Sequence, residues 1–194
     1  KVKIVISGAG AAGMATAKIL KAAGAVNILV LDRQGIIEKG REGLEGHKKE
    51  IAGFTNPYSA RGALREALTE ADVLIGVSGP GLAEAKDISL MNRGAIVFAL
   101  ANPTPEIMPE EAKKGGAVVI ATGRSDFPNQ VNNSLAFPGI FRGALDNRVT
   151  KITDEMKLKA AYAIAKLVPK PTAVKILPDM FDKRVAPAVA KVIK

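Results

Sequence analysis

Cysteine is absent from this 194-residue chain, and several other residue types are scarce. Without cysteine the protein has no disulfide bond, no thiolate metal ligand and no cysteine nucleophile. Tryptophan is also absent, and only two tyrosines and six phenylalanines occur, so the interleaved aromatics of single-strand nucleic-acid binders are missing. The longest apolar runs, such as 95–101, fall far short of the roughly 20 residues that a membrane-spanning helix needs. We therefore expect a soluble, cytoplasmic protein without a signal peptide and without a membrane partner.

Acidic residues are fewer than basic ones. The chain has 19 aspartates and glutamates and 28 lysines and arginines, which gives a formal net charge of +9. Nucleic acid, an anionic membrane or a polyanionic small ligand would each balance such an excess. The basic residues are scattered, however, and the pairs Lys48-Lys49 and Lys113-Lys114 stand alone. We interpret the excess as a solvated lysine-rich surface, and we expect no nucleic-acid partner.

Hydrophobic residues make up 47% of the chain, which is enough to form the core of one sizeable domain. Strand and helix signals alternate from the first residue, which is typical of a mostly parallel sheet covered on both faces. We predict an α/β fold with a doubly wound sheet and its helices over 1–150, followed by a helical extension over 151–194. The predicted strands are 2–6, 28–31, 73–77, 95–100 and 117–121. Helices are expected near 14–20, 47–54, 61–69, 84–91 and 109–114, beyond 137, and at 154–167 and 186–193, with a loop over 33–46.

Three glycines with the spacing G-x-G-x-x-G lie between the first predicted strand and the first predicted helix. In this position Gly8 permits a tight turn, Gly10 lets the backbone approach a pyrophosphate, and Gly13 lets helix and strand pack closely. The free N–H groups and the positive end of the helix dipole then favour the phosphate charge. The motif predicts a Rossmann-like dinucleotide site at Gly8, Ala9, Gly10, Ala11, Ala12 and Gly13.

Asp32 ends the second predicted strand, about 20 residues beyond Gly13, where a carboxylate commonly accepts hydrogen bonds from the adenosine ribose. That position favours NAD. Arg33 follows immediately and has the charge to pair with a 2′-phosphate, so NADP remains an alternative.

Polar residues also follow the later strands, at the sheet edge where ligands of doubly wound folds bind. Ser78, Asn102 and Arg124 each come after one predicted strand, although Asn102 is equally well explained as a turn residue before Pro103. The segment 129–133 packs four amide side chains beside the apolar residues 135–141, which fits either a solvent loop or a ligand contact.

No reaction centre is visible in the sequence. The single histidine, His47, lies in a polar stretch without an evident partner, and we interpret it as a surface residue. Tyr58 and Tyr162 lack the neighbours that would mark an acid or a base. Clustered carboxylates for a hard metal ion are not apparent either, because the candidates are separated: Asp126, Asp146, Asp179 and Asp182.

The glycine turn at 8–13, the segment 98–107 and the residues from 121 to 146 together resemble the NAD(P)-binding domain of the malic enzyme family, in its small prokaryotic branch. The resemblance extends over essentially the whole chain. It implies oxidative decarboxylation of malate to pyruvate and carbon dioxide with NAD or NADP as cofactor, assisted by Mg²⁺ or Mn²⁺. It also implies that Asn102 lies near the nicotinamide ribose and the substrate. Asn133 would bind the malate carboxylate or hydroxyl, and Asn132 is a further candidate for the same pocket.

In that family the tyrosine acid, the lysine base and the metal-binding carboxylates come from a region that precedes the first strand found here. The resemblance therefore implies that an N-terminal catalytic domain is the missing partner, and that the full-length protein is a homo-oligomer. We expect this chain to bind cofactor without turnover. The alternative is a non-catalytic module that senses NAD(H) or docks to another protein.

Overall fold

A computed structural model describes all residues from 1 to 194, and the chain divides into two compact units, Lys1–Phe127 and Pro128–Lys194. This division falls before residue 151, where the sequence predicts the helical extension to begin. The reason lies in the second unit, where the helix formed by Phe137–Asp146 shares a core with the later helices.

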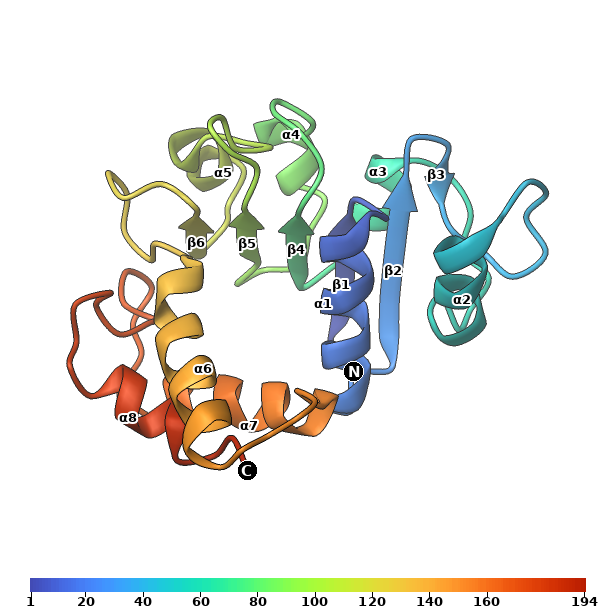
Figure 1. Cartoon of the computed structure of the whole chain (residues 1–194). Coiled ribbons are helices and arrows are strands. Elements are labelled where there is room, and N and C mark those ends of the chain that lie inside the picture. The colour runs from blue at the N-terminus through green and yellow to red at the C-terminus, as the bar shows by residue number, and fades with distance from the viewer. The chain divides into compact units, whose positions relative to one another are not determined.

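A six-stranded sheet with the strand order β3-β2-β1-β4-β5-β6 organises the first unit (Figure 1). All neighbouring strands are parallel except β3, which runs antiparallel to β2. The doubly wound fold predicted from the sequence is confirmed, and this strand order is the one found in dinucleotide-binding sheets. The elements are β1 (Lys3–Ser7), α1 (Ala11–Ala22), β2 (Asn27–Asp32), β3 (Gly35–Ile36), α2 (Gly46–Phe54), α3 (Leu64–Leu68), β4 (Val73–Gly76), α4 (Ala85–Ile88), β5 (Ile96–Ala99), α5 (Pro109–Lys114) and β6 (Val119–Thr122).

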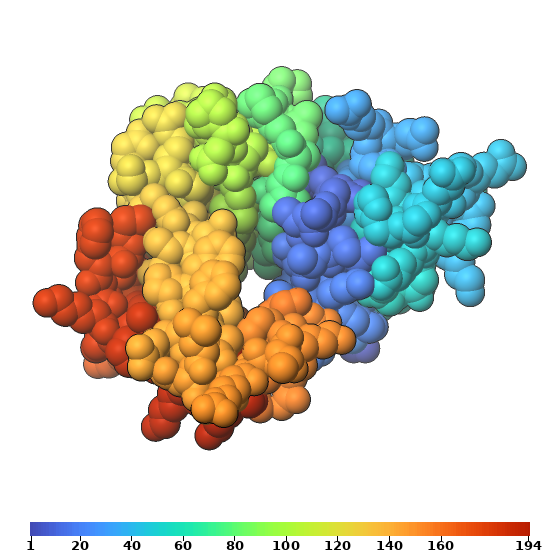
Figure 2. Space-filling view, viewed as in Figure 1, coloured from blue at the N-terminus to red at the C-terminus, as the bar shows by residue number.

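Alternation of side chains along the strands creates two cores, one on each face of the sheet. In β1, Val5 packs into one cluster with residues of α3, α4 and α5, whereas Ile4 and Ile6 pack into the other with residues of α1 and α2. Figure 1 shows α1 in front of the sheet, and Figure 2 shows the blue atoms of α1 beside the cyan atoms of α2. Both faces are therefore buried, as the continuous apolar strands predict.

Local backbone geometry explains where the predicted elements differ from the observed ones. The segment 33–46 contains β3, a strand of two residues that is too short to produce a periodic signal. The helix predicted from 61 begins only at Leu64, because Gly62 has a φ of +119° and the Ala63 N–H donates to the Glu66 carboxylate. The helix predicted over 84–91 is confined to α4, at 85–88.

The second unit is helical and contains η1 (Asn133–Leu135), α6 (Phe137–Asp146), α7 (Asp154–Ala165) and α8 (Val185–Ala190). Its core gathers Leu135, Ala160, Val185, Val189 and Ile193. Close packing of α6 on α8 depends on Gly139, where a Cβ would lie 2.5 Å from the Val189 Cβ. None of the helices in either unit combines the length and the apolarity that crossing a membrane requires.

Candidate dinucleotide-binding site

The turn between β1 and α1 is shaped by its first and last glycines. Gly8 has a φ of +123°, and a Cβ there would lie 2.6 Å from the Val77 carbonyl oxygen. At Gly13 a Cβ would lie 1.8 Å from the Gly8 carbonyl oxygen, so only glycine fits the turn as it stands. A Cβ at Gly10 would meet nothing within 4 Å. Because no side chain caps α1, its first N–H groups remain available to an anion.

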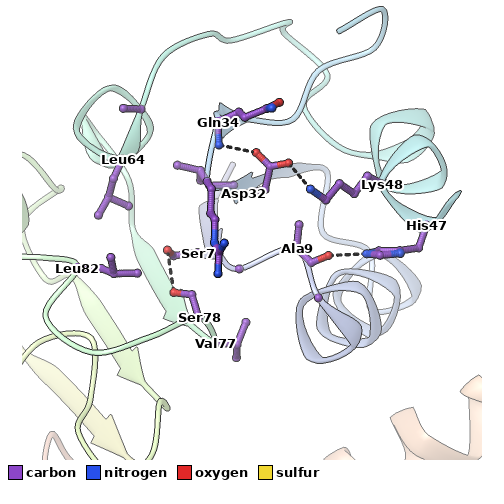
Figure 3. Close-up of a pocket in the computed structure, with 16 residues that line it drawn as sticks. Ser7, Ala9, Asp32, Gln34, His47, Lys48, Leu64, Val77, Ser78 and Leu82 are labelled. Atoms are coloured by element: carbon purple, nitrogen blue, oxygen red, sulfur yellow. Dashed lines mark hydrogen bonds and ion pairs between the residues drawn. The ribbon is translucent and has the colours of Figure 1, made fainter. Parts of the chain in front are cut away.

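A cleft of about 850 Å³ opens beside this turn, over the carboxyl ends of β1, β2 and β4 (Figure 3). Its size lies within the usual range of small-molecule sites. Six of the sequence-predicted residues line it together: Gly8, Ala9, Gly10, Asp32, Arg33 and Ser78. Ala11, Ala12 and Gly13 are in the first turn of α1 and do not line the cleft. Residues that were not predicted also line it, among them Ser7, Gln34, His47, Lys48, Leu64 and Leu82.

Asp32 ends β2 with a carboxylate that is almost fully engaged. Its Oδ2 accepts hydrogen bonds from the Arg41 guanidinium at 2.6 Å and from the Lys48 ammonium at 2.7 Å, while Oδ1 accepts one from the Gln34 N–H at 2.9 Å. Burial alone would raise the pKa of Asp32, but the hydrogen bonds from Arg41 and Lys48 outweigh burial and lower the pKa below its usual value. The group is therefore ionised, and three of its roughly four acceptor sites are used, which leaves one for a ligand hydroxyl.

The same end of the cleft carries more positive than negative charge. Arg33 is exposed, lines the cleft and forms no ion pair, while Lys48 keeps 38% of its side chain exposed beside Asp32. Arg41 is largely buried beneath them. Two cations thus bond to one carboxylate while a third, Arg33, lines the same cleft, and an anionic ligand would be attracted to this end.

His47 is a surface residue, as predicted, but its contact with the glycine turn corrects the expectation that it has no partner. The ring is exposed, yet its Nε2 lies 2.7 Å from the Ala9 carbonyl oxygen. Since a carbonyl oxygen only accepts, Nε2 is the donor in this bond. Figure 3 shows the ring directed from α2 toward Ala9, below the bond between Lys48 and Asp32. The contact joins residues that are 38 positions apart, so no local sequence pattern could indicate it.

The floor of the cleft is tied together by hydroxyl and carboxylate groups. The hydroxyls of Ser7 and Ser78 lie 3.3 Å apart, as Figure 3 shows. Behind them Glu106, only 2% exposed, accepts the Ser78 N–H at 2.9 Å and the Ala101 N–H at 3.0 Å. Glu106 lies within the family-like segment 98–107, but nothing in the sequence distinguishes it from a surface glutamate.

The three amides predicted to contact substrate do not line this cleft. Asn102 is exposed after β5, and its side chain lies against Gly123, where a Cβ would be 2.8 Å from the Asn102 Nδ2. In the second unit, Asn132 uses its Oδ1 to accept the Ser134 N–H at the start of η1, and Asn133 is exposed. Their contacts with substrate remain predictions.

Two further polar candidates have structural partners. Arg124 forms a bidentate pair with Asp126 at 2.9 and 2.7 Å, and its guanidinium also lies over the Phe127 ring. The buried Asn129 donates to the Ala173 carbonyl and accepts the Ile176 N–H, so its amide holds a turn of the second unit.

The donor groups of the chain do not assemble into a metal site. The structure, which describes every residue, brings no three histidine, aspartate or glutamate side chains together in a way that would hold an ion. The separated carboxylates are engaged elsewhere, as Asp126 pairs with Arg124 and Asp182 with Arg184. We therefore derive no metal-dependent step from the residues of this chain.

Comparison with known proteins assigns the whole domain. The family model "Malic enzyme, NAD binding domain" matches residues 1–193. The chain is 52% identical to the bifunctional malic/malolactic enzyme of Bacillus subtilis, covering 99% of this chain and 48% of that protein. It is 47% identical to the NAD-dependent malic enzyme of Geobacillus stearothermophilus (99% and 40% covered) and 46% identical to the NADP-dependent malic enzyme of Halomonas elongata (93% and 42% covered).

A solved structure gives the same result. The NAD-dependent malic enzyme of Thermotoga maritima superposes with a TM-score of 0.95 at 45% identity, covering 100% of this chain and 52% of that one. The chain thus spans about half, or less, of the length of these relatives. With a family model that matches nearly every residue, the predicted resemblance is confirmed, and the chain belongs to the malic enzyme family as its NAD-binding domain.

Proposed function

We propose that this chain is the cofactor-binding part of an enzyme that oxidatively decarboxylates malate to pyruvate and carbon dioxide while NAD or NADP is reduced. The observation that carries the proposal is the cleft itself, where a glycine turn with free N–H groups meets a cluster of cations. Free N–H groups at a helix N-terminus suit the pyrophosphate of a dinucleotide, and cations beside a strand-end carboxylate suit an adenosine ribose that carries a 2′-phosphate. The proposal is supported by the relatives, which are named as malic enzymes with NAD or NADP dependence or as a malic/malolactic enzyme.

Each group of residues has a role in this proposal. The N–H groups at the start of α1 hold the diphosphate, with Gly8, Ala9 and Gly10 admitting it to the backbone. Asp32 and Arg33 face the adenosine ribose, and Ser78 contacts the cofactor farther along the cleft floor. When bound, the cofactor supplies the hydride-accepting nicotinamide ring.

Substrate recognition is proposed to rest on amides. Asn102, Asn132 and Asn133 can donate hydrogen bonds to carboxylate and hydroxyl oxygens without adding charge. They would orient malate toward the nicotinamide, so that the C2 hydrogen leaves as hydride and carbon dioxide leaves in the following step. The acid, the base and the ligands of Mg²⁺ or Mn²⁺ would come from the remainder of a longer cytoplasmic, homo-oligomeric protein.

Isothermal titration of the 194-residue chain with NAD and with NADP tests cofactor binding. We expect a saturable heat with at least one of them, and no malate-dependent absorbance at the wavelength of the reduced cofactor. A folded sample that gives no heat with either dinucleotide would refute the proposal. Turnover of malate by this chain alone would refute the assignment of the chemistry to another part of the protein.

Complementation separates an enzyme part from the alternative of an NAD(H)-sensing or docking module. The chain would be mixed with the N-terminal portion of the Bacillus subtilis relative, which the chain does not cover. Restored decarboxylation supports the enzyme, and a mixture containing the Gly10→Ala chain serves as the cofactor-deficient control. If the two parts associate in a sedimentation run and remain inactive, the sensing module is favoured.

A further inference from the structure

Glu106 is a buried carboxylate that the proposed function does not use. It is 2% exposed, and no lysine, arginine or histidine pairs with it. Removing a carboxylate from water is unfavourable unless hydrogen bonds replace the lost hydration. Its two oxygens are occupied separately, since Oε1 accepts the Ser78 N–H and Oε2 accepts the Ala101 N–H. The carboxylate is thus stabilised by backbone donors alone.

Those two donors belong to different loops. Ser78 follows β4, Ala101 follows β5, and the strands pair in parallel with Gly76 opposite Ala99. Ligands of doubly wound sheets bind at this carboxyl edge. Glu106 therefore links the two loops at the edge where a cofactor is expected, through the N–H of Ser78 in one loop and the N–H of Ala101, the residue before Asn102, in the other.

Gly76, at the end of β4, has no side chain and so leaves the space that the Glu106 side chain occupies. A Cβ at Gly76 would lie 2.4 Å from the Glu106 Cδ, and its three nearest atoms would all belong to Glu106. The main chain around Glu106 also bonds to the Ser78 loop, because the Ala83 N–H donates to the Glu106 carbonyl and the Gly81 N–H to the Pro105 carbonyl. Backbone and side chain thus fix the same two loops.

We propose that Glu106 is a positioning residue that sets the distance between the Ser78 loop and the Ala101–Asn102 segment, so that the nicotinamide half of the dinucleotide can bind. Glu106 itself does not line the cleft. The inference rests on the proposed function, because it assumes that a dinucleotide occupies the cleft. The adenosine half binds at the other side of the glycine turn, against Asp32, and does not depend on Glu106.

Binding of two ligands tests the inference in the 194-residue chain. NAD contains both halves, whereas ADP-ribose lacks the nicotinamide. For Glu106→Ala we expect the NAD Kd to increase about tenfold, as for the loss of a single well-placed interaction, while the ADP-ribose Kd changes less than about twofold. If Glu106 only stabilised the fold, the binding of both ligands would weaken equally, in proportion to the fraction of the chain that remains folded. Asp87→Ala, which removes another buried carboxylate with a backbone partner at α4, is the matched control.

Gly76→Ala supplies an independent test. The added methyl group would displace the Glu106 carboxylate, so this variant should reproduce the selective loss of NAD binding. In the double variant with Glu106→Ala the methyl group has room, and the NAD Kd should be no higher than in Glu106→Ala alone. If the two effects multiply instead, Gly76 and Glu106 act separately and the inference is wrong.

Comparison of the wild-type chain with Glu106→Ala separates the proposed function from the positioning role. If the wild-type chain binds neither NAD nor ADP-ribose, the proposed function fails. If the wild-type chain binds both and Glu106→Ala weakens them equally, or neither, the positioning role is refuted while the proposed function stands. Should Glu106→Ala be unfolded by circular dichroism, Glu106→Gln retains one acceptor oxygen and turns an NH₂ group against the other loop. Glu106→Gln should also weaken the binding of NAD more than that of ADP-ribose, with a smaller increase in the NAD Kd than for Glu106→Ala. An equal change in the two Kd values would refute the inference.

Discussion

Gly10 and Gly13 lie in the same turn, yet a side chain would meet different surroundings at each. At Gly10 a Cβ has no neighbour within 4 Å, and the backbone angles of −82° and −164° suit alanine. We therefore predict that Gly10→Ala leaves the free energy of unfolding within about 0.5 kcal/mol of wild type. The same methyl group faces the cleft, so the NAD Kd should increase at least about tenfold. Urea unfolding and calorimetry measure the two quantities.

Gly13→Ala is the matched variant, because its Cβ would meet the Gly8 carbonyl oxygen at 1.8 Å. This overlap should cost about 1–3 kcal/mol of stability in addition to affinity. A stable Gly13→Ala chain that binds NAD normally would show that the turn is looser than its geometry indicates.

Arg33 is the cation of the cleft with no ion-pair partner, and we predict that it contributes to the choice between NAD and NADP. Arg33→Ser should raise the NADP Kd about tenfold, the effect of one charge-assisted contact, and leave the NAD Kd nearly unchanged. Lys39→Ser removes an exposed charge that does not line the cleft and serves as the control. An equal loss for both cofactors would exclude a contact between Arg33 and the 2′-phosphate.

Acid should weaken the Asp32 cluster. Hydrogen bonds from Arg41 and Lys48 lower the pKa of Asp32 in the folded state. The ionised carboxylate therefore contributes to stability at pH values above 3.8, which is its pKa in the unfolded chain. This contribution is lost as the pH falls through the lower pKa of the folded state. We predict that Asp32→Asn is less stable than wild type at pH 6 and that the difference shrinks below about pH 4. Urea midpoints at pH 6, 4 and 3 measure this. Glu42→Gln, which removes an exposed carboxylate that forms no ion pair, is the control, and a constant difference between Asp32→Asn and wild type would contradict the prediction.

At the scale of elements, α6 and α8 form the tightest helix contact of the second unit. A Cβ at Gly143 would lie 2.5 Å from the Ala190 carbonyl oxygen, which is backbone and cannot easily move. We predict that Gly143→Ala lowers stability by about 1–3 kcal/mol through this overlap. Arg142→Ala, on the exposed side of the same helix, should change it by less than about 0.5 kcal/mol. Thermal unfolding followed by circular dichroism compares them, and equal midpoints for both variants would contradict the close packing.

Elements with a strong local signal were predictable from the sequence. All five predicted strands occur, because continuous β-branched runs bounded by glycine, proline or polar residues admit few alternatives. α5 was located by Pro109 at its first turn. β3 was missed because two residues have no periodicity, and α3 was predicted too long because its start depends on the positive φ of Gly62.

The same distinction applies to the site. Gly8, Asp32 and Ser78 were identified because each follows a strand, and strand ends can be read from the sequence. His47, Lys48 and Arg41 were not, because their roles arise when α2 and the segment before it fold back against β1 and β2. Glu106 was missed for a related reason, since only the assembled sheet brings its acceptors to both loops.

For the whole molecule, part of the basic surface is engaged by carboxylates of the same chain. Twelve of the 28 lysines and arginines form ion pairs with carboxylates. We predict that any binding to a labelled duplex DNA is weak, disappears between about 50 and 200 mM salt, and is displaced at low salt by millimolar NAD. Fluorescence anisotropy measures this. Salt-resistant binding that NAD does not displace would restore nucleic acid as a partner.

The close approach of Gly13 to the Gly8 carbonyl also determines when the backbone of the turn loses its conformational entropy. The peptide groups of the turn are held in place by this close contact and by backbone hydrogen bonds, in which the Gly8 N–H donates to the Leu31 carbonyl and the Met14 N–H to the Gly10 carbonyl, before any diphosphate arrives. Their ordering is therefore completed during folding, and an incoming ligand has little backbone freedom left to remove. Such preorganisation would lower the entropic cost of binding the proposed dinucleotide.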